Sequence, residues 1–386
     1  MLLTAKQEEG LKIAVKRFRD HEPYTCIAGY AGTGKSTLIR FIISALNLDP
    51  EDVCYVAYTG KAAQVLRSKG CPNAMTAHRL LYKSIQKDDG TFYHIPLRPI
   101  IGFDLIVVDE ISMLPKHMWE LLLSHKIHVI ALGDPGQLPP VLAEDNGVLA
   151  FPHIFLDEVM RQAAESEIIR LTMDIREGNS LKPFLGNEVR IVGREELLEP
   201  GFLAWGDQII CGKNETRHQI NTIMRKIKMQ TDQTEPLIGD RIICLHNEWE
   251  CINLTGDALV NGLSGTITGL ENTNDNPFME KTPLIDFKPD IDDSDTFKGL
   301  EADYKIFTEH VPTVTKETFK KIPKFYRPKE FDYGYCITCH KSQGSEYDKV
   351  IVLEEYLRGE SKDGHSRWLY TAATRAAKKL IIVRNY

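Results

Sequence analysis

The sequence predicts an α/β protein in which two parallel-sheet domains follow one another along the chain. Short apolar runs alternate with helical patterns, and polar or glycine-rich residues follow each run. This pattern is typical of parallel strands that are buried on both faces of a doubly wound sheet. One group of runs lies before residue 160 and a second group lies after residue 200, which predicts two domains of similar build. The runs are 24–28, 53–57, 105–108, 128–132, 208–211, 335–338, 349–353 and 379–383.

The length and composition fit a globular protein of two or three domains. The chain has 386 residues, of which 42% are hydrophobic and 26% charged, and this balance excludes a disordered, collagen-like or coiled-coil protein. No stretch approaches the roughly 18 uninterrupted apolar residues of a membrane span. Residues 1–18 read as a charged amphipathic helix without the apolar core of a secretory signal. We therefore expect a cytoplasmic protein without a membrane partner (in the host cytoplasm if a phage encodes it).

Two segments break the alternation of strands and helices. Residues 83–101 contain Asp89-Gly90 between two short alternating runs, which is a strong signal of a β-hairpin. Residues 246–332 begin with strand-like runs and glycine turns, continue with an acidic run, and end with a basic and aromatic run at 316–329. We interpret this longer segment as a small β domain inserted into the second α/β domain.

A phosphate-binding loop follows the first predicted strand. Residues 29–36 (GYAGTGKS) match the pattern G-x-x-x-x-G-K-[ST] in full, between the strand YTCIA and the helical segment TLIRFIISAL. Glycines in such a loop allow backbone N–H groups to surround phosphate oxygens at a helix N-terminus. Lys35 is expected to contact the β- and γ-phosphates, and the Ser36 hydroxyl is expected to bind Mg²⁺.

Acidic and amide side chains follow the next two buried strands. Asp109 and Glu110 end the run LIVVDE, and Gln137 lies in the turn after the run HVIAL. A carboxylate at the end of a strand beside a phosphate-binding loop is the expected Mg²⁺ ligand, which assigns that role to Asp109. Glu110 is then positioned as the general base that activates water, and Gln137 as a sensor of the γ-phosphate. These residues predict a P-loop NTPase without saying what hydrolysis drives.

The motifs, taken together, resemble those of superfamily 1 helicases, and within them the RecD-like/Dda group (superfamily 1B). They occur in the order of that family from residue 4 to residue 377, nearly the whole chain. The matching segments are LTAKQEEGL, GYAGTGKST, YTGKAAQVL, MTAHRLL, VVDEISM, LGDPGQLPPV, LDEVMRQ, TCHKSQGSEYDKVIV and LYTAATRA.

The resemblance implies two RecA-like P-loop NTPase domains that face each other across one ATP and its Mg²⁺. It divides the chain into a first RecA-like domain (1–82 and 102–185) with a β-hairpin pin (83–101), and a second (186–245 and 333–386) with an SH3-like insert (246–332). It also implies that Arg375, together with Arg161, reaches the transferred phosphoryl group, and that Gln7 reads the adenine. The implied nucleotide-binding residues are Gln7, Gly29, Gly32, Thr33, Gly34, Lys35, Ser36, Thr37 and Gly344.

The same resemblance implies a monomeric enzyme that moves 5′ to 3′ along single-stranded DNA and acts at duplex junctions. Single-strand-binding, replication or recombination proteins are the further partners it suggests. Phe92, just after the predicted hairpin turn, is the candidate for separating base pairs. The residues implied to contact the strand are Thr59, Lys61, Thr76, His78, Phe92, Thr338, His340, Lys341, Ser342 and Gln343.

Two other functions are compatible with the motifs: a RecD-like subunit of a larger helicase–nuclease complex, and a DNA-stimulated ATPase that remodels protein–DNA complexes without unwinding. RNA is also open as the substrate, since no residue pattern reports a 2′-OH contact. The sequence Cys336-Ile-Thr-Cys-His340 fits a haem-attachment pattern, but it lies within a helicase motif and no second C-x-x-C accompanies it for zinc. Buried, reduced cysteines explain it better.

The net charge of −7 taken alone argues against a nucleic-acid partner. Local charge changes that expectation: residues 213–228 carry five Lys/Arg against one Glu, and residues 316–330 carry six against two acids. We therefore expect a narrow basic channel that binds single strands in a salt-sensitive manner with little sequence preference.

Overall fold

The computed structural model describes residues 3–86, 92–97, 99–100, 102–139, 144–199, 201–255, 257–273, 276–279, 282–291, 294–323 and 326–384. Side chains are described for these residues except at 84–86, 92–94, 161–162, 249–250, 272–273 and 316. The hairpin turn expected at Asp89-Gly90 and the aromatic Phe325 thus lie outside the described residues. Within the described part, no helix combines the length and the apolar character that crossing a membrane requires.

The first α/β unit contains a six-stranded, wholly parallel sheet in the order β3-β2-β6-β7-β1-β8. The expected strands of this half are confirmed within one residue at each end. The strands are β1 (Tyr24–Gly29), β2 (Val53–Ala57), β3 (Met75–Thr76), β6 (Leu105–Val108), β7 (His128–Gly133) and β8 (Ile154–Leu156).

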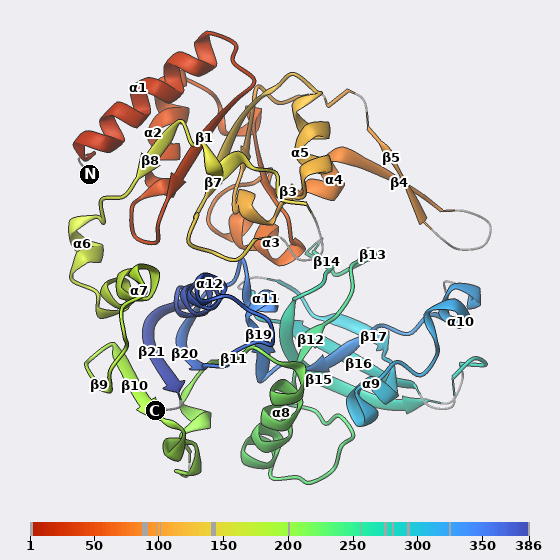
Figure 1. The fold of residues 1–386 in the computed structure, drawn as a ribbon. Helices are drawn as coiled ribbons and strands as arrows, with labels where there is room; N and C mark the ends of the chain where they lie inside the picture. Colours follow the sequence, from red (N-terminus) through yellow and green to blue (C-terminus); the bar gives the residue numbers. More distant parts are fainter. Residues whose placement is uncertain are drawn as a thin grey trace.

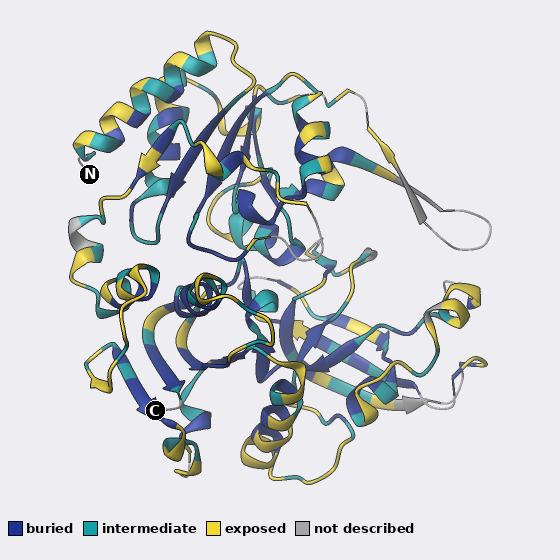
Figure 2. Cartoon of the chain, viewed as in Figure 1, coloured by how far each residue is buried: buried dark blue, intermediate teal, exposed yellow. Residues whose placement is uncertain are grey.

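Helices cover both faces of this sheet, as the continuous apolar strands require. Along β6, Leu105 and Val107 pack into one core cluster while Ile106 and Val108 pack into another, because successive side chains point to opposite faces. Burial of both faces is visible in Figure 2 as dark strands beneath half-exposed helices. The helices are α1 (Ala5–Arg19), α2 (Lys35–Leu46), α3 (Gly60–Ser68), α4 (Ala77–Leu81) and α5 (Lys116–Leu123).

The second α/β unit repeats this architecture with a sheet in the order β19-β11-β20-β21-β10-β9, parallel except for β9. Helix α12 lies on the side that faces the first unit (Figure 1). The strands are β9 (Phe184–Leu185), β10 (Val189–Gly193), β11 (Gln208–Cys211), β19 (Cys336–Thr338), β20 (Tyr347–Leu353) and β21 (Ala376–Arg384). The helices are α6 (Arg161–Ala164), α7 (Glu167–Glu177), α8 (Asn214–Met229), α11 (Cys339–Ser342) and α12 (Lys362–Ala373).

A five-stranded antiparallel sheet lies between β11 and β19 in the sequence, in the order β17-β16-β15-β12-β18. This sheet extends beyond both ends of the expected segment 246–332. Its strand β12 begins at Arg241, and β18, which pairs with β12, ends at Tyr333. Its strands are β12 (Arg241–Cys244), β15 (Ser264–Thr273), β16 (Thr282–Pro289), β17 (Phe297–Glu301) and β18 (Phe331–Tyr333); the ribbon β13 (Glu248–Ile252) and β14 (Ala258–Leu259) and the helices α9 (Tyr304–Glu309) and α10 (Lys316–Lys321) accompany it.

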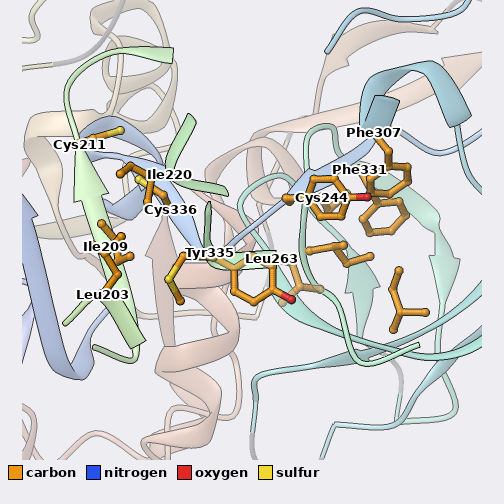
Figure 3. Packing of buried hydrophobic residues seen from close by; sticks show 14 of the residues in the cluster. Leu203, Ile209, Cys211, Ile220, Cys244, Leu263, Phe307, Phe331, Tyr335 and Cys336 are labelled. Atoms are coloured by element: carbon orange, nitrogen blue, oxygen red, sulfur yellow. The ribbon is translucent and has the colours of Figure 1, made fainter. Parts of the chain in front are cut away.

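The antiparallel sheet and the second α/β sheet share one hydrophobic core. Ile209 and Cys211 of β11 belong to the same buried cluster as Phe331 of β18 and Leu263 beside β15. In Figure 3, Tyr335 lies between the two groups of side chains. The insert is therefore packed continuously onto the second unit.

A two-stranded antiparallel ribbon projects from the first unit on the side where the insert lies (Figure 1). Its strands β4 (Tyr82–Gln86) and β5 (Phe92–Pro96) pair from Tyr82 with Pro96 to Gln86 with Phe92. An antiparallel ribbon is thus present where the alternating runs around Asp89-Gly90 predict a hairpin.

Candidate active site and nucleic-acid interface

The phosphate-binding loop connects β1 to α2 through two glycines with left-handed backbone. Gly32 has φ +76° and Gly34 has φ +79°, conformations that side-chain-bearing residues rarely adopt. A Cβ on Gly34 would also lie 2.5 Å from Nε2 of Gln7. Thr33 is buried and donates its hydroxyl to the Tyr30 carbonyl at 2.8 Å, so it braces the loop from inside.

Lys35, the first residue of α2, bends back over the loop. Its Nζ donates to the carbonyl oxygens of Gly29 at 2.6 Å and Tyr30 at 3.1 Å. Ser36 is exposed and lines a cavity of about 480 Å³ beside the loop. The ammonium therefore has partners that phosphate oxygens can replace, as expected for a P-loop lysine. Thr37 follows in the first turn of α2 and is half-buried.

Asp109 and Glu110 line the same cavity from the end of β6. The backbone N–H of Glu110 donates to Asp109 Oδ1 at 3.0 Å, and Glu110 itself has φ +52°. Burial, followed by the neighbouring Glu110, raises the pKa of Asp109 to about 6. The Ser36 hydroxyl and two carboxylates offer the oxygen ligands that Mg²⁺ prefers, so these residues fit the expected ion.

Gln137 approaches the acidic pair from the loop after β7. Its Nε2 donates to Glu110 Oε1 at 3.4 Å, and only 7% of the residue is exposed. The amide thus lies next to the carboxylate that the sequence assigns as the base. This contact brings together two motifs that are separated by a strand and a helix.

The second α/β unit completes the wall of the cavity. Arg375 and Gly344 line it opposite Ser36 and Asp109. Arg375 is buried and donates to the Thr371 carbonyl at 3.0 Å and the Ser345 carbonyl at 3.3 Å. These bonds hold the guanidinium within the second unit, where Arg375 is part of the cavity wall. Arg161 begins α6, but its side chain lies outside the described residues.

Gln7 occupies a fixed position at the outer side of the loop. Its Oε1 accepts from the backbone N–H of Thr4 at 3.0 Å within a capping box at the start of α1, and its Nε2 donates to the Thr33 carbonyl at 3.2 Å. The side chain is buried, so the helix cap and the loop orient one amide together. Adenine recognition by Gln7 stays a prediction.

A second cavity of about 260 Å³ gathers expected strand-contacting residues from both units. Lys341 Nζ donates to Oδ1 of Asn261 at 3.1 Å, and Lys61 Nζ donates to the hydroxyl of Tyr347 at 3.2 Å. Burial, followed by Arg217, lowers the pKa of Lys341. The lining residues include Thr59, Lys61, Asn261, Gly262, His340, Lys341 and Gln343.

A neighbouring cavity of about 370 Å³ contains Thr76 and His78 and is closed on one side by the insert residues Ile252 and Val260. Thr59 and Thr76 are N-caps, since their hydroxyls accept from the first turns of α3 and α4 at 3.2 Å. Each hydroxyl keeps its own proton for a further acceptor. The ring of His78 packs between those of Tyr58 and Tyr82, each centroid 6.0 Å away.

Two expected strand contacts are not placed at these surfaces. Ser342 is 0% exposed and donates its hydroxyl to the Cys339 carbonyl at 2.7 Å, because the short helix α11 turns it inward. Thr338 is the half-buried N-cap residue of α11 and lines neither cavity. Phe92 begins β5, and its side chain lies outside the described residues.

Sequence reasoning missed the insert residues Asn261, Gly262 and Val260, which close both cavities. They lie in the turn that directly follows β14 and carry no motif, so no local signal distinguishes them. Cys336 and Cys339 are buried and free, and burial raises the pKa of Cys339 to about 12, which agrees with the reduced thiols expected from the sequence.

Comparison with known proteins reports helicase relatives for both halves of the chain. A family model described as an AAA domain matches residues 3–191, and one described as a UvrD-like helicase C-terminal domain matches residues 333–383. The chain is 25% identical over 275 residues to the ATP-dependent DNA helicase dda of Enterobacteria phage T4, covering 62% of this chain and 60% of that protein.

It is also 35% identical over 163 residues to the ATP-dependent RecD2 DNA helicase of Deinococcus radiodurans, covering 40% of this chain and 22% of that protein. The chain thus spans less than two thirds of either relative. The crystal structure of a Bacteroides Pif1 helicase with ADP-AlF3 and ssDNA shares the fold, with TM-score 0.57, 19% identity and coverage of 99% of this chain and 92% of that one. In these matches the chain is similar to superfamily 1 helicases of the Dda/RecD-like group (superfamily 1B).

Proposed function

We propose that the protein is an ATP-dependent DNA helicase that requires Mg²⁺ and moves along single-stranded DNA. The observation that carries the proposal is the shared cavity, which is lined by Ser36, Asp109 and Glu110 of one unit together with Arg375 of the other. A nucleotide bound there contacts both units at once. Binding and release of ATP then change how the two units sit against each other.

The side chains in and beside this cavity supply the chemistry of phosphoryl transfer to water. Lys35 neutralises phosphate charge, and Ser36 with Asp109 would hold the Mg²⁺ ion, which would polarise the phosphates. Glu110 accepts the proton of the attacking water, and Gln137 beside it orients that water. Arg375 stabilises the charge of the transition state, a contribution that reaches roughly 10³–10⁵ in rate in the best-studied NTPases.

Single-stranded DNA is expected to lie across the two smaller cavities. Threonine hydroxyls, the ammonium groups of Lys61 and Lys341, and His78 suit contacts to the phosphate backbone and bases that do not depend on sequence. Because residues of both units line this path, closure of the units on ATP moves one set of contacts toward the other. We propose that this cycle advances the strand, in the 5′ to 3′ direction, through a monomer.

Unwinding of duplexes with a single-stranded overhang tests the proposal. We expect unwinding of a DNA duplex with a 5′ overhang, in the presence of ATP and Mg²⁺. Lys35→Ala should abolish hydrolysis and unwinding while keeping the circular dichroism spectrum and thermal midpoint of the wild type. Unwinding from a 3′ overhang alone would overturn the direction, and preference for an RNA duplex would overturn the substrate. Strand-stimulated hydrolysis without any unwinding would replace the helicase by a remodelling ATPase.

We further propose that the ribbon β4–β5 acts as the wedge between the two strands, with Phe92 at its outer end. Phe92→Ala should slow unwinding several-fold while strand-stimulated hydrolysis stays near the wild-type rate, because stacking of an aromatic ring on a base contributes about 1–3 kcal/mol. Tyr356→Ala, at a residue that is 67% exposed in the second unit, is the matched control. Equal losses of unwinding and hydrolysis in Phe92→Ala would exclude the wedge.

A further inference from the structure

Tyr370, on helix α12 of the second unit, makes two hydrogen bonds to the first unit. Its hydroxyl donates to Asp134 Oδ2 at 2.6 Å and accepts from the backbone N–H of Ala31, in the phosphate-binding loop, at 3.0 Å. Tyr370 and Asp134 are 1% and 2% exposed. The hydroxyl therefore joins the phosphate-binding loop to the loop after β7 through a residue of the opposite unit.

Because the Tyr370 hydroxyl is buried, water cannot replace either of its two hydrogen bonds. Burial raises the pKa of Asp134, and burial together with Asp134 raises that of Tyr370. A buried acceptor or donor that loses its partner costs more than the bond itself contributes, because no water reaches it. The Tyr370 ring also packs against the backbone of Gly136, where a Cβ would lie 3.1 Å from Cε1.

Two neighbouring residues of the second unit hold the same loop. Thr371 Oγ1 accepts from the Leu138 N–H at 3.0 Å, and Gln343 Nε2 donates to the Leu138 carbonyl at 3.4 Å. Gln137, between these anchor points, contacts Glu110. Gln343 also lines the cavity of about 260 Å³, together with His340 and Lys341. One loop thus lies between the surface expected to bind the strand and the carboxylate expected to activate water.

We propose that Tyr370 is a positioning residue that couples occupation of the strand channel to ATP hydrolysis. Its hydroxyl locks the loop 134–138 against the phosphate-binding loop, so that Gln137 and Glu110 are aligned only when α12 is docked on the first unit. Strand binding at His340 and Lys341 favours this docked arrangement through Gln343 and α12. The inference rests on the proposed function, because it assigns a role within strand-stimulated hydrolysis.

Steady-state ATP hydrolysis by the full chain, with and without a single-stranded oligonucleotide, tests this coupling. Tyr370→Phe keeps the ring and removes the hydroxyl. We expect the strand-stimulated kcat to fall about tenfold or more, since one buried bond to a charged group is lost and a second donor is left unpaired. The KM for ATP should change by less than about threefold, because Lys35 and Ser36 are untouched.

Tyr335→Phe is the matched control. Tyr335 is also a buried tyrosine whose hydroxyl donates to a buried aspartate, Asp240, at 3.0 Å, and it lies away from the nucleotide cavity. Both variants should lose similar thermal stability, but only Tyr370→Phe should lose strand stimulation. Thr371→Val removes the acceptor of the Leu138 N–H and should also lower strand-stimulated ATP hydrolysis. This variant provides the test if Tyr370→Phe does not fold.

A double-mutant cycle locates the effect. Because Tyr370 acts through Asp134, Tyr370→Phe combined with Asp134→Asn should reduce kcat no further than the more severe single variant. Strand stimulation that survives equally in Tyr370→Phe and Tyr335→Phe would overturn the inference. A wild-type chain that hydrolyses ATP without any strand stimulation would instead overturn the proposed function, and the inference with it.

Discussion

Several polar side chains at the site bond to a backbone partner and still have a hydrogen-bonding group for a ligand. Thr59 and Thr76 accept helix N–H groups and retain a hydroxyl proton, and Lys35 donates to backbone carbonyls that phosphates can replace. Ser342 departs from this arrangement, since its only polar atom is committed inside the fold. Residue type alone does not separate these two outcomes, because Thr59, Thr76 and Ser342 all carry a short hydroxyl in or beside a helix.

At the scale of single residues, His218 on α8 is enclosed by groups that disfavour its charged form. Its ring lies against that of His310, tilted by 32° with centroids 3.7 Å apart, and Arg217 Nη2 lies 3.2 Å from its Nε2. Asp332, at 3.8 Å, is itself paired with Arg217 at 2.9 Å. Burial first, then Arg217 and His310, lower the pKa of His218 to about 4.

This predicts a specific loss of stability in acid. The unfolded chain binds a proton at His218 near pH 6.5, whereas the folded chain binds it only near pH 4. The contribution of His218 to the free energy of unfolding is therefore complete above about pH 6.5. It is lost progressively as the pH falls toward 4. His218→Gln should flatten the pH dependence of the urea midpoint in that window. The exposed His117→Gln is the control, and an equal flattening in both variants would contradict the prediction.

At the scale of elements, the ribbon β13–β14 closes onto α3 across the strand path. Gln64 Nε2 donates to the Ala258 carbonyl at 3.3 Å, and Arg67 pairs with Asp257 at 3.3 Å. Gly60, at the start of α3, allows the closest approach, since a Cβ there would lie 2.4 Å from the side chain of Val260. The contact joins the insert to the opposite α/β unit (Figure 1).

Gly60→Ala should therefore lower the free energy of unfolding by about 1–3 kcal/mol, the usual cost of overpacking. Alanine on an open helix would instead be neutral or stabilising relative to glycine, so the sign of the change reports the contact. Chemical denaturation measures this change in the free energy of unfolding. The loss should shrink when Gly60→Ala is made in a Val260→Gly background, and a loss of the same size in both backgrounds would exclude this contact as its cause.

At the scale of the whole molecule, a net charge of −7 coexists with a local set of ammonium groups at the cavities. Lys61 and Lys341, one from each unit, line the same cavity, while the acidic excess is carried by the rest of the chain. Such an arrangement favours a few strong phosphate contacts over a broad electrostatic attraction.

Lys341→Ala should weaken single-stranded DNA binding and reduce the slope of log K against log salt by about 0.7, the value for one phosphate contact on a single strand. Fluorescence anisotropy at several salt concentrations measures the slope. Lys378→Ala is the control, because this exposed lysine pairs with Asp348 at 2.7 Å and lines neither strand cavity. An unchanged slope in Lys341→Ala would remove this residue from the phosphate path.

The sequence by itself determined the two mainly parallel sheets and the glycine-rich loop between β1 and α2. Continuous apolar runs specify strands buried on both faces, and the spacing from Gly29 to Ser36 specifies a loop whose geometry is local. The alternating runs around Asp89-Gly90 likewise predicted the ribbon β4–β5. These features depend on neighbours in the chain, which is why pattern and propensity are sufficient to find them.

Only the tertiary structure decided how the two units meet. Tyr370 and Asp134 are 236 residues apart, and Gln343 and Leu138 are 205 apart, so no local pattern reports either hydrogen bond. The same holds for the core that the insert shares with the second sheet, where the expected boundary at 246 falls inside continuous packing. Burial and pairing across such distances depend on the whole fold, because each partner is placed by its own sheet before the two surfaces come together.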